Sequence, residues 1–391
     1  MQSVSLDRAG IVGALDTETT PAGGIVLRRL PDWTRHQILD ESLPLLATMP
    51  AGVRLELVTD TTALELDVHL TVLQLGDGPV VPAAFDLVVG AGDGAGGDVR
   101  TQSSDEGTRI VVDLRTGSVD FQPGGPTTIR FDGLPGIAGT RIEVWLPHAA
   151  VVELRDVRID DGATATPAAA APNGERRRWI HHGSSISHCM EATQPTGTWP
   201  AVTARLADVD LQNLAFAGQC LLDQHVARTI RDLPADVISI KCGINVVNGD
   251  SMRERTFVPA VHGFLDTVRD GHPATPIAVV TPIFCPSVED HPGPTVMGED
   301  GTFGTVDRPA ELATGSLSLR RIRELLHTIV ESRRAQGDTN LHLLDGLELF
   351  GADDVDDLPD LLHPNPAGYR RMGERFHAMA FAPGGPLAAA D

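Results

Sequence analysis

The sequence predicts an all-β, jelly-roll-like sandwich followed by a three-layer α/β/α sandwich with about five parallel strands. Up to residue 160, short apolar runs alternate with polar residues, which is the period of half-buried strands. A stretch rich in alanine, proline and glycine follows. After it, short apolar runs alternate with helical segments, the pattern of a parallel sheet covered by helices. We therefore expect a β-sandwich domain over 1–160, a linker over 161–177 and a second domain over 178–391.

Charge and composition restrict the partners. The chain has 391 residues and a formal net charge of −22, which disfavours binding to nucleic acid or to an anionic membrane. Residues 1–16 carry charges and no apolar core of signal-peptide length, and no apolar run is long enough to span a bilayer. These features predict a cytoplasmic protein. The sequence does not indicate an oligomeric state.

The predicted strands of the first domain lie between turn-rich breaks. Alternating apolar residues mark them at 55–57, 64–72, 110–114 and 142–146. Five aromatic residues are available for a sugar-binding platform: Trp33, Phe85, Phe121, Phe131 and Trp145. We expect these few rings to be core residues and the domain to serve packing or to shape an active site, with carbohydrate binding as the alternative.

The second domain contains the regular β-α alternation. After the strand at 179–182, strands are predicted at 209–215, 237–240, 277–280 and 341–344. Helices are predicted at 200–207, 221–233, 252–269, 317–334 and 366–381. Ligands of such sheets bind beyond the carboxyl ends of the strands.

A candidate nucleophile lies at the first of these strand ends. Trp179-Ile180-His181-His182 runs into Gly183-Ser184-Ser185-Ile186-Ser187, a strand, a glycine turn and a serine just ahead of a helix. Near the other end of the chain, Asp360 and His363 precede a helix whose first turn contains Pro366. Ser185, Asp360 and His363 together form a candidate catalytic triad.

Two further motifs follow the next two strands. Gly218 ends the stretch Asn213-Leu214-Ala215-Phe216-Ala217-Gly218, and Asn245 ends Lys241-Cys242-Gly243-Ile244-Asn245. Acyl transfer develops negative charge on a carbonyl oxygen, which preorganised N–H donors must meet. A glycine allows close backbone approach, and an asparagine amide adds a side-chain donor. Each residue alone is an ordinary turn residue, but their position between nucleophile and base favours an oxyanion hole.

These motifs, in this order and spacing, resemble the SGNH (GDSL-like) hydrolase superfamily over roughly residues 178–382. The resemblance implies that Ser185 is the nucleophile, with Asp360 and His363 completing the triad. It further implies an oxyanion hole made by the Ser185 and Gly218 N–H groups and the Asn245 amide. No metal or organic cofactor is implied.

The sequence departs from the family pattern at two positions. Ser184 stands where the family usually has an acid, and Val246 follows the third-block asparagine where an acid is usual. Neither position belongs to the catalytic set. Ser184 and Ser187 remain alternative nucleophiles, although the motif alignment favours Ser185.

Histidines and cysteines raise the alternative of a metal site. His181, His182, His188 and Cys189 cluster in sequence. Neighbouring residues of a strand point to opposite faces, so His181 and His182 cannot both bind one ion there, and no second ligand cluster completes the set. The four cysteines lack paired spacing and are expected to be reduced core residues: Cys189, Cys220, Cys242 and Cys285.

The implied activity is serine-dependent acyl transfer through an acyl-enzyme. We expect an acyltransferase that moves an acyl group, aryl-containing acyl groups included, from an ester or thioester to a hydroxyl of a small molecule such as a natural product. The alternatives are an intracellular esterase or deacetylase acting on a small-molecule or sugar ester, and a non-catalytic sugar-binding module. The irregular segment 284–316 is either an active-site lid, in which Met297 and Phe303 contact an apolar acyl group, or a mobile surface loop.

Overall fold

The computed structural model describes residues 1–5, 10–38, 42–76, 78–90, 97–113, 116, 118–168 and 176–389. The chain divides into two compact units. Unit 1 comprises Met1–Arg176 and Thr193–Thr196, and unit 2 comprises Arg177–Ala192 and Gly197–Asp391. The short segment Thr193–Thr196 therefore belongs to unit 1, although it follows the first strand of unit 2 in sequence.

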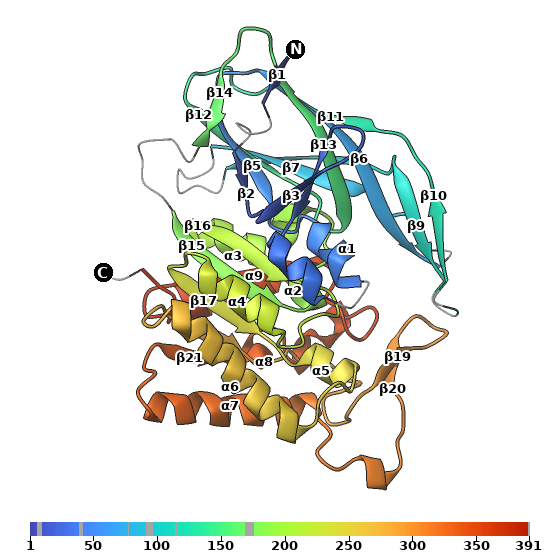
Figure 1. The fold of residues 1–391 in the computed structure, drawn as a ribbon, viewed down its shortest axis with the longest axis vertical. Helices are drawn as coiled ribbons and strands as arrows, with labels where there is room; N and C mark the ends of the chain where they lie inside the picture. The colour runs from blue at the N-terminus through green and yellow to red at the C-terminus, as the bar shows by residue number, and fades with distance from the viewer. Residues whose placement is uncertain are drawn as a thin grey trace. The chain divides into compact units, whose positions relative to one another are not determined.

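Unit 1 is built from two sheets (Figure 1). Within the described residues, sheet A runs in the order β10 (Val119–Gln122), β9 (Thr108–Val112), β6 (Ala63–Leu75), β13 (Ala150–Ile159), β4 (Ile25–Arg28) and β3 (Asp16–Thr19), with β1 (Gln2–Val4) beside β13 and β11 (Thr127–Asp132) beside β6. Sheet B runs in the order β14 (Ala165–Pro167), β5 (Arg54–Thr59), β12 (Thr140–Trp145), β7 (Ala83–Val89) and β8 (Asp98–Ser104), with β2 (Ile11–Val12) beside β5. The pairings are antiparallel except that β6 and β9 run parallel. Among the described residues of this unit, the short helices η2 (Asp32–Gln37) and α1 (Ser42–Thr48) accompany the sheets.

The core of unit 1 follows the alternation seen in the sequence. On β6, Leu64, Leu66, Val68 and Leu70 are fully buried, and they pack with apolar residues of sheet B such as Leu57 in one cluster. The predicted all-β region is confirmed. Leu114, the last residue of one predicted strand, and the glycine-rich break at 91–96 lie outside the described residues.

The predicted linker has strand structure in its first part. Ala165–Pro167 form β14, which pairs antiparallel with β5, so regular structure continues past residue 160. Residues 169–175 lie outside the described residues. The domain limits themselves stay a prediction.

Unit 2 contains sheet C, five parallel strands in the order β16 (Val209–Ala215), β15 (Arg177–Gly183), β17 (Val237–Lys241), β18 (Ile277–Val280) and β21 (Leu341–Leu344). Every neighbouring pair is parallel. Buried strands with helices on both faces need to be apolar along their length, and β17 and β18 are buried at every position. The predicted three-layer sandwich is confirmed.

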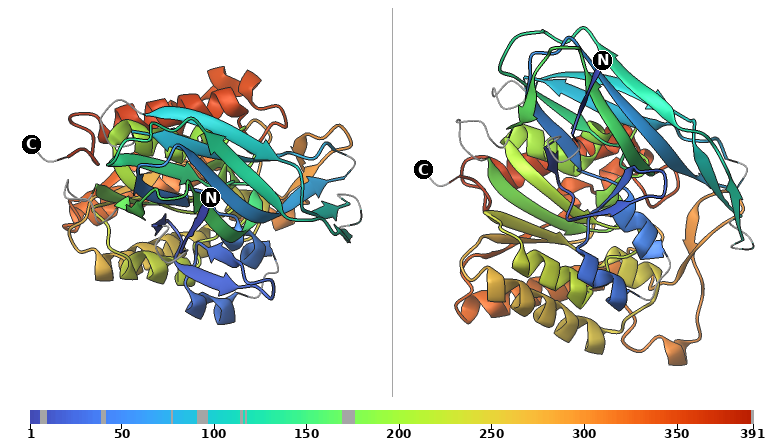
Figure 2. Two further views of the ribbon diagram at one scale, coloured as in Figure 1. Left: turned by 90° about the horizontal axis from the view of Figure 1, so that it is seen from above. Right: turned by 45° about the horizontal axis from the view of Figure 1, so that its top comes forward.

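Helices cover both faces of sheet C. The described helices are α2 (Ser185–His188), α3 (Trp199–Ala207), α4 (Gln224–Asp232), α5 (Ile244–Asn248), α6 (Glu254–Gly271), α7 (Leu319–Ala335), α8 (Gly346–Leu349) and α9 (Pro366–Phe376), with the one-turn π-helix η7 (His377–Phe381) and the 3₁₀ turns η4 (Pro195–Gly197), η5 (Ala310–Leu312) and η6 (Ala352–Asp357). Helices α4, α6 and α7 lie on one face, and α3 and α9 pack together on the other (Figure 1). Both views of Figure 2 show the golden α6 and the red α9 on opposite sides of the sheet.

The strand order reverses at β15, which pairs with β16 on one side and β17 on the other. Connections leave the sheet in opposite directions on either side of such a strand, and ligands bind at this switch point. The segments after β15, β16 and β17 are therefore the ones expected to form a site. Among the described residues, every helix is too short or too polar to span a lipid bilayer.

Candidate active site

Ser185 begins α2 directly after β15. Gly183 makes this turn possible, because a Cβ there would lie 2.4 Å from Ser187 Oγ and 3.1 Å from His181 Nε2. Helix α2 is a single turn that ends at Cys189, whose φ is 61° and whose N–H donates to Ser185 O. The chain thus holds Ser185 at the carboxyl end of β15, the second strand of sheet C.

Burial distinguishes the three candidate serines. Ser184 and Ser187 have relative exposures of 0%. Ser185 is only partly buried. Because a nucleophile must reach an external substrate, accessibility favours Ser185 over Ser184 and Ser187 as the candidate.

The structure brings the three residues of the predicted triad together. His363 Nε2 lies 3.0 Å from Ser185 Oγ, and His363 Nδ1 lies 2.7 Å from Asp360 Oδ2. These distances are within hydrogen-bonding reach for a nucleophile, a base and the group that orients the base. These distances fit the tautomer in which His363 Nδ1–H donates to Asp360 and Nε2 accepts from the Ser185 hydroxyl.

The loop that carries Asp360 and His363 is held by its own backbone. Asp360 Oδ1 accepts hydrogen bonds from the N–H groups of Leu362, at 2.9 Å, and His363, at 2.6 Å. Asn365 then caps α9 by accepting from the Gly368 N–H, and Pro366 occupies the first turn, as the sequence predicted. Asp360 therefore fixes both the orientation of the imidazole and the conformation of the loop.

Two carboxylates govern the charge of His363. Burial lowers the pKa of the imidazole, but the nearby charges of Glu191 and Asp360 and the hydrogen bond to Asp360 outweigh burial, so the pKa lies above its ordinary value. Burial likewise raises the pKa of Asp360, yet the hydrogen bond and charge of His363 and two backbone N–H groups bring it below the ordinary value. The pair is therefore suited to holding an imidazolium beside a carboxylate.

The two candidate oxyanion residues lie at neighbouring strand ends. Gly218 adopts φ of 71° in the turn after β16, and Asn245 is in the first turn of α5 after β17. Asn245 Oδ1 accepts from the Cys220 N–H at 2.9 Å, which fixes the carboxamide and leaves its NH2 group as the donor. Gly243 is required before α5, because its φ is 123° and a Cβ would lie 2.7 Å from Ile322 Cγ2.

The irregular segment after β18 contains a hairpin that reaches the triad loop. Strands β19 (Thr295–Met297) and β20 (Phe303–Thr305) pair antiparallel. The Phe303 N–H donates to Asp360 O at 2.9 Å, and the Phe303 ring stands edge-on to the His363 ring, with centroids 5.8 Å apart. Met297 is partly exposed, at 39%.

His181 and His182 face opposite layers of unit 2, as the strand period predicted. His181 packs edge-on against Trp199 of α3, whereas His182 stacks on Phe264 of α6. Burial lowers the pKa of both imidazoles, that of His182 to about 4. They are neutral core groups. Among the residues described by the structure, no cluster of His, Cys, Asp or Glu is arranged to hold a metal ion, and all four cysteines are buried and free.

The aromatic residues of unit 1 divide into core and surface. Phe85, Phe131 and Trp145 are buried, as predicted. The prediction is wrong for Phe121, which is 65% exposed, because every residue of its strand β10 is exposed. Trp33 is partly exposed.

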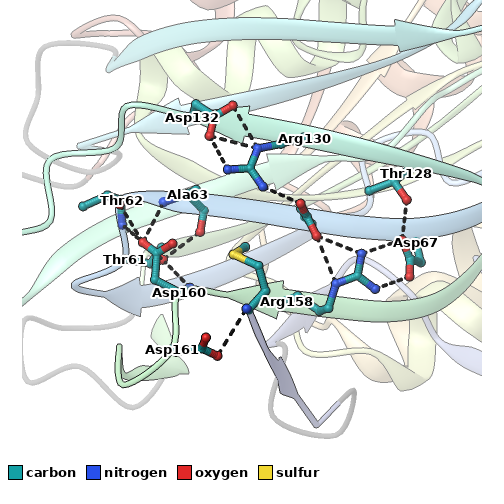
Figure 3. Close-up of polar contacts among 12 residues, drawn as sticks. Thr61, Thr62, Ala63, Asp67, Thr128, Arg130, Asp132, Arg158, Asp160 and Asp161 are labelled. Carbon is teal, nitrogen blue, oxygen red and sulfur yellow. Dashed lines mark hydrogen bonds and ion pairs between the residues drawn. The ribbon is translucent and has the colours of Figure 1, made fainter.

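Part of sheet A is occupied by ion pairs rather than rings (Figure 3). Arg158 pairs with Glu65 and Asp67, and Arg130 pairs with Glu65 and Asp132. A platform of stacked aromatic side chains is not formed by these residues.

One residue near the triad was not predicted. Glu191 Oε1 lies 3.7 Å from His363 Nδ1, although Glu191 belongs to none of the four sequence motifs. No local pattern indicates it, because the contact joins residues far apart in the chain.

Comparisons with known proteins agree with this geometry. The model of the GDSL-like lipase/acylhydrolase family matches residues 176–285, which include β15, Ser185, Gly218 and Asn245. The chain carries a GDSL-like lipase/acylhydrolase domain. No curated protein sequence matches the chain at a significant level.

Solved structures resemble the chain over nearly its full length. A salicylyl acyltransferase, SsfX3, from a tetracycline biosynthetic pathway is 27% identical with a TM-score of 0.75, covering 96% of this chain and 95% of that one. The order of a β-rich region and an SGNH-like domain predicts this resemblance, and the comparison confirms it. A putative GDSL-like lipase from Bacteroides ovatus is 18% identical with a TM-score of 0.65, covering 96% and 95%.

A family two carbohydrate esterase from Clostridium thermocellum, in complex with cellohexaose, is 14% identical with a TM-score of 0.54, covering 94% and 97%. At this identity the likeness concerns the fold alone. The GDSL-like domain and its enzyme relatives identify the chain as an SGNH-type enzyme.

Proposed function

We propose that this SGNH-type enzyme transfers acyl groups through an acyl-enzyme, with Ser185 as nucleophile, His363 as general base and Asp360 orienting the base. The observation that carries the proposal is the continuous hydrogen-bonded chain from Ser185 Oγ through the His363 ring to Asp360. A non-catalytic sugar-binding module has no need of this arrangement.

The proposed steps follow from the atoms present. His363 Nε2 takes the Ser185 hydroxyl proton while Oγ attacks the carbonyl carbon of the donor. The imidazolium then gives this proton to the departing alcohol or thiol, and Ser185 is left acylated. A hydroxyl acceptor, or water, loses its proton to His363 and attacks the ester, and the proton returns to Ser185 Oγ. Asp360 remains ionised throughout, consistent with its depressed pKa.

We assign stabilisation of the oxyanion to the N–H groups of Ser185 and Gly218 and the amide of Asn245. The hydrogen bond from Cys220 to Asn245 Oδ1 supports this role, because it preorganises the amide before substrate binds. Preorganised donors of this kind contribute about 3 kcal/mol each to the barrier reduction.

Transfer to a small-molecule hydroxyl, from an ester or thioester donor, is the favoured reaction. It is supported by the full-length likeness to a salicylyl acyltransferase at 27% identity. The edge-on Phe303 ring beside His363 also supports a flat aryl or apolar acyl group, since aromatic edges and faces pack favourably. Ester hydrolysis is the second candidate, because the matching family is one of lipases and acylhydrolases.

Intact-protein mass spectrometry separates these reactions. The enzyme is incubated with aryl and alkyl thioesters, with and without hydroxylated natural products, and both the acyl-enzyme and the free products are quantified. Acceptor-dependent formation of an acylated product, exceeding hydrolysis, supports transfer. Release of free acid at the same rate with and without acceptor supports the esterase. Absence of any acyl-enzyme, together with the same turnover in Ser185→Ala, overturns the covalent mechanism.

A further inference from the structure

A second carboxylate lies on the Nδ1 side of His363. Glu191 follows α2 and is six positions after Ser185. Its Oε1 lies 3.7 Å from His363 Nδ1, beyond the 2.7 Å hydrogen bond that Nδ1 makes with Asp360. At this distance the interaction is between charges, not a direct hydrogen bond.

Local structure places Glu191 there. Cys189 closes α2 in the left-handed conformation, and the Ala192 N–H donates back to Cys189 O at 2.9 Å. The chain therefore changes direction directly after α2, and this turn places Glu191 near His363. Residues of one short turn thus supply both the attacking hydroxyl and this carboxylate.

The buried Tyr369 fixes the orientation of Glu191. Its hydroxyl donates to Glu191 Oε2 at 2.6 Å, and its side chain on α9 is fully buried. Burial and the charge of Glu191 hold the pKa of Tyr369 well above its ordinary value. The phenol consequently stays protonated and donates at every working pH, with Oε1 left toward the imidazole.

We propose that Glu191, held by Tyr369, is a positioning residue that tunes His363 as a base and stabilises the imidazolium formed when Ser185 is deprotonated. The inference rests on the proposed role of His363 in acyl transfer. The groups that face this ring are Asp360 from its own loop, Glu191 from the turn after α2, the Ser185 hydroxyl and the neutral Phe303 ring. None of these contacts supplies a positive charge that would cancel Glu191.

The direction of the effect follows from the sign of the charge. An anion beside an imidazole favours the protonated form and raises its pKa. A stronger base accepts the serine proton more readily in the transition state, while a larger fraction of it is already protonated at low pH. Removing the charge should therefore lower the maximal rate and move the acidic limb of the pH profile to lower pH.

The test compares the Glu191→Gln variant with the unmutated enzyme. The rate of single-turnover acylation by a p-nitrophenyl ester is measured from pH 5 to 9. We expect the plateau rate to fall about three- to tenfold and the acidic limb to move down by about half a pH unit or more. Because the Glu191 side chain is 36% exposed, added salt should reduce the difference.

Two variants act as controls. Tyr369→Phe keeps the Glu191 charge but loses its anchor, so a smaller shift in the same direction is expected. Glu331→Gln removes one charge from an exposed position of α7 and should leave the profile unchanged.

Melting temperatures measured on the same samples separate tuning from structure. A Glu191→Gln enzyme with an unchanged pH profile and plateau overturns the inference, whether or not its melting temperature falls. That outcome leaves the acyl-enzyme mechanism intact, because the loss of acylation in Ser185→Ala tests it independently.

Discussion

Two groups of ionisable residues, one in each unit, show opposite uses of charge. In unit 1, Glu56 is 4% exposed and accepts hydrogen bonds from three guanidinium groups, those of Arg54, Arg141 and Arg176, at 2.6–2.7 Å. In unit 2, the imidazole of His363 stands beside two carboxylates and a serine hydroxyl.

The difference lies in whether charge is neutralised permanently or held ready to change. Burial raises the pKa of Glu56, but its three arginine neighbours more than offset this, and the pKa is lowered. No proton can usefully enter or leave such a group near neutral pH. His363, with an ordinary pKa close to neutrality and a raised value here, can gain and lose a proton during turnover. The first arrangement stabilises structure, and the second suits catalysis.

The largest expected effect comes from removing the nucleophile. Ser185→Ala should reduce acylation by at least about 10⁴-fold, because no other group replaces the attacking oxygen. The fold should persist, since the hydroxyl fills no core position. Labelling by a serine-directed phosphonate, read by mass spectrometry, checks this. Undiminished labelling of the variant would move the nucleophile to another residue, with Ser184→Ala and Ser187→Ala as the matched comparisons.

The next largest effect is expected at Asn245, which does not titrate. Asn245→Ala should slow acylation by about 100- to 1,000-fold, with little change in apparent donor affinity, because the hydrogen bond strengthens mainly in the transition state. Single-turnover rates and melting temperatures measured on one preparation separate the two possible roles. A loss of stability with normal turnover per folded molecule would make Asn245 a turn residue only.

At the unit 1 cluster the expected loss is of stability, not of chemistry. Glu56→Gln removes the anion shared by three guanidinium groups, of which that of Arg54 is buried and that of Arg176 keeps Glu143 as a second partner. It should lower the free energy of unfolding by about 3 kcal/mol at pH 7. Urea unfolding measures this, and Glu106→Gln, at an exposed position of the same unit, is the matched control. Equal stability of the two variants would contradict the charge-neutralisation account.

The same cluster predicts a pH dependence. Because the pKa of Glu56 is lower in the folded protein than in the unfolded chain, its contribution is present above the unfolded value near pH 4 and is lost as pH falls through the folded pKa. The difference between native protein and Glu56→Gln should therefore shrink below about pH 4. A constant difference down to pH 3 would argue that lost packing is responsible.

The smallest effect is expected at the hairpin. Phe303→Ala should lower the preference for aryl over acetyl donors by about fivefold, which corresponds to one edge-to-face contact. Competition between two thioesters in one reaction measures the ratio directly. Phe121→Ala, which removes an exposed ring of unit 1, should leave it unchanged. An equal change of the aryl-to-acetyl ratio in both variants would show that the hairpin has no role in donor selection.

Much of unit 2 could be predicted because its information is local. Three strands begin and end at the predicted residues, 209–215, 277–280 and 341–344, since short apolar runs between helices have few other interpretations. The residues of the candidate triad could be predicted because their motifs lie beyond the ends of strands, where the topology of parallel sheets brings such segments together.

The features that were missed depend on tertiary contacts. Glu191 reaches His363 only because α2 ends after one turn and α9 places Tyr369 beside it. Phe121 alternates like a core residue, but its strand lies at the end of sheet A, where both of its faces remain exposed. Alternation of apolar and polar residues shows which side chains share a face of a strand. It does not indicate whether another layer of the protein buries that face.

Tyr369 is the only tyrosine of the chain, and its hydroxyl contacts Glu191, which lies beside His363. A sample grown with tyrosine labelled with 13C at the ring Cζ alone therefore gives one tyrosine resonance that needs no assignment. Its chemical shift depends on the strength of one hydrogen bond, which responds to the charge on the neighbouring imidazole. We expect this resonance to shift when His363 becomes protonated, so that the charge beside Ser185 can be monitored without attaching a probe.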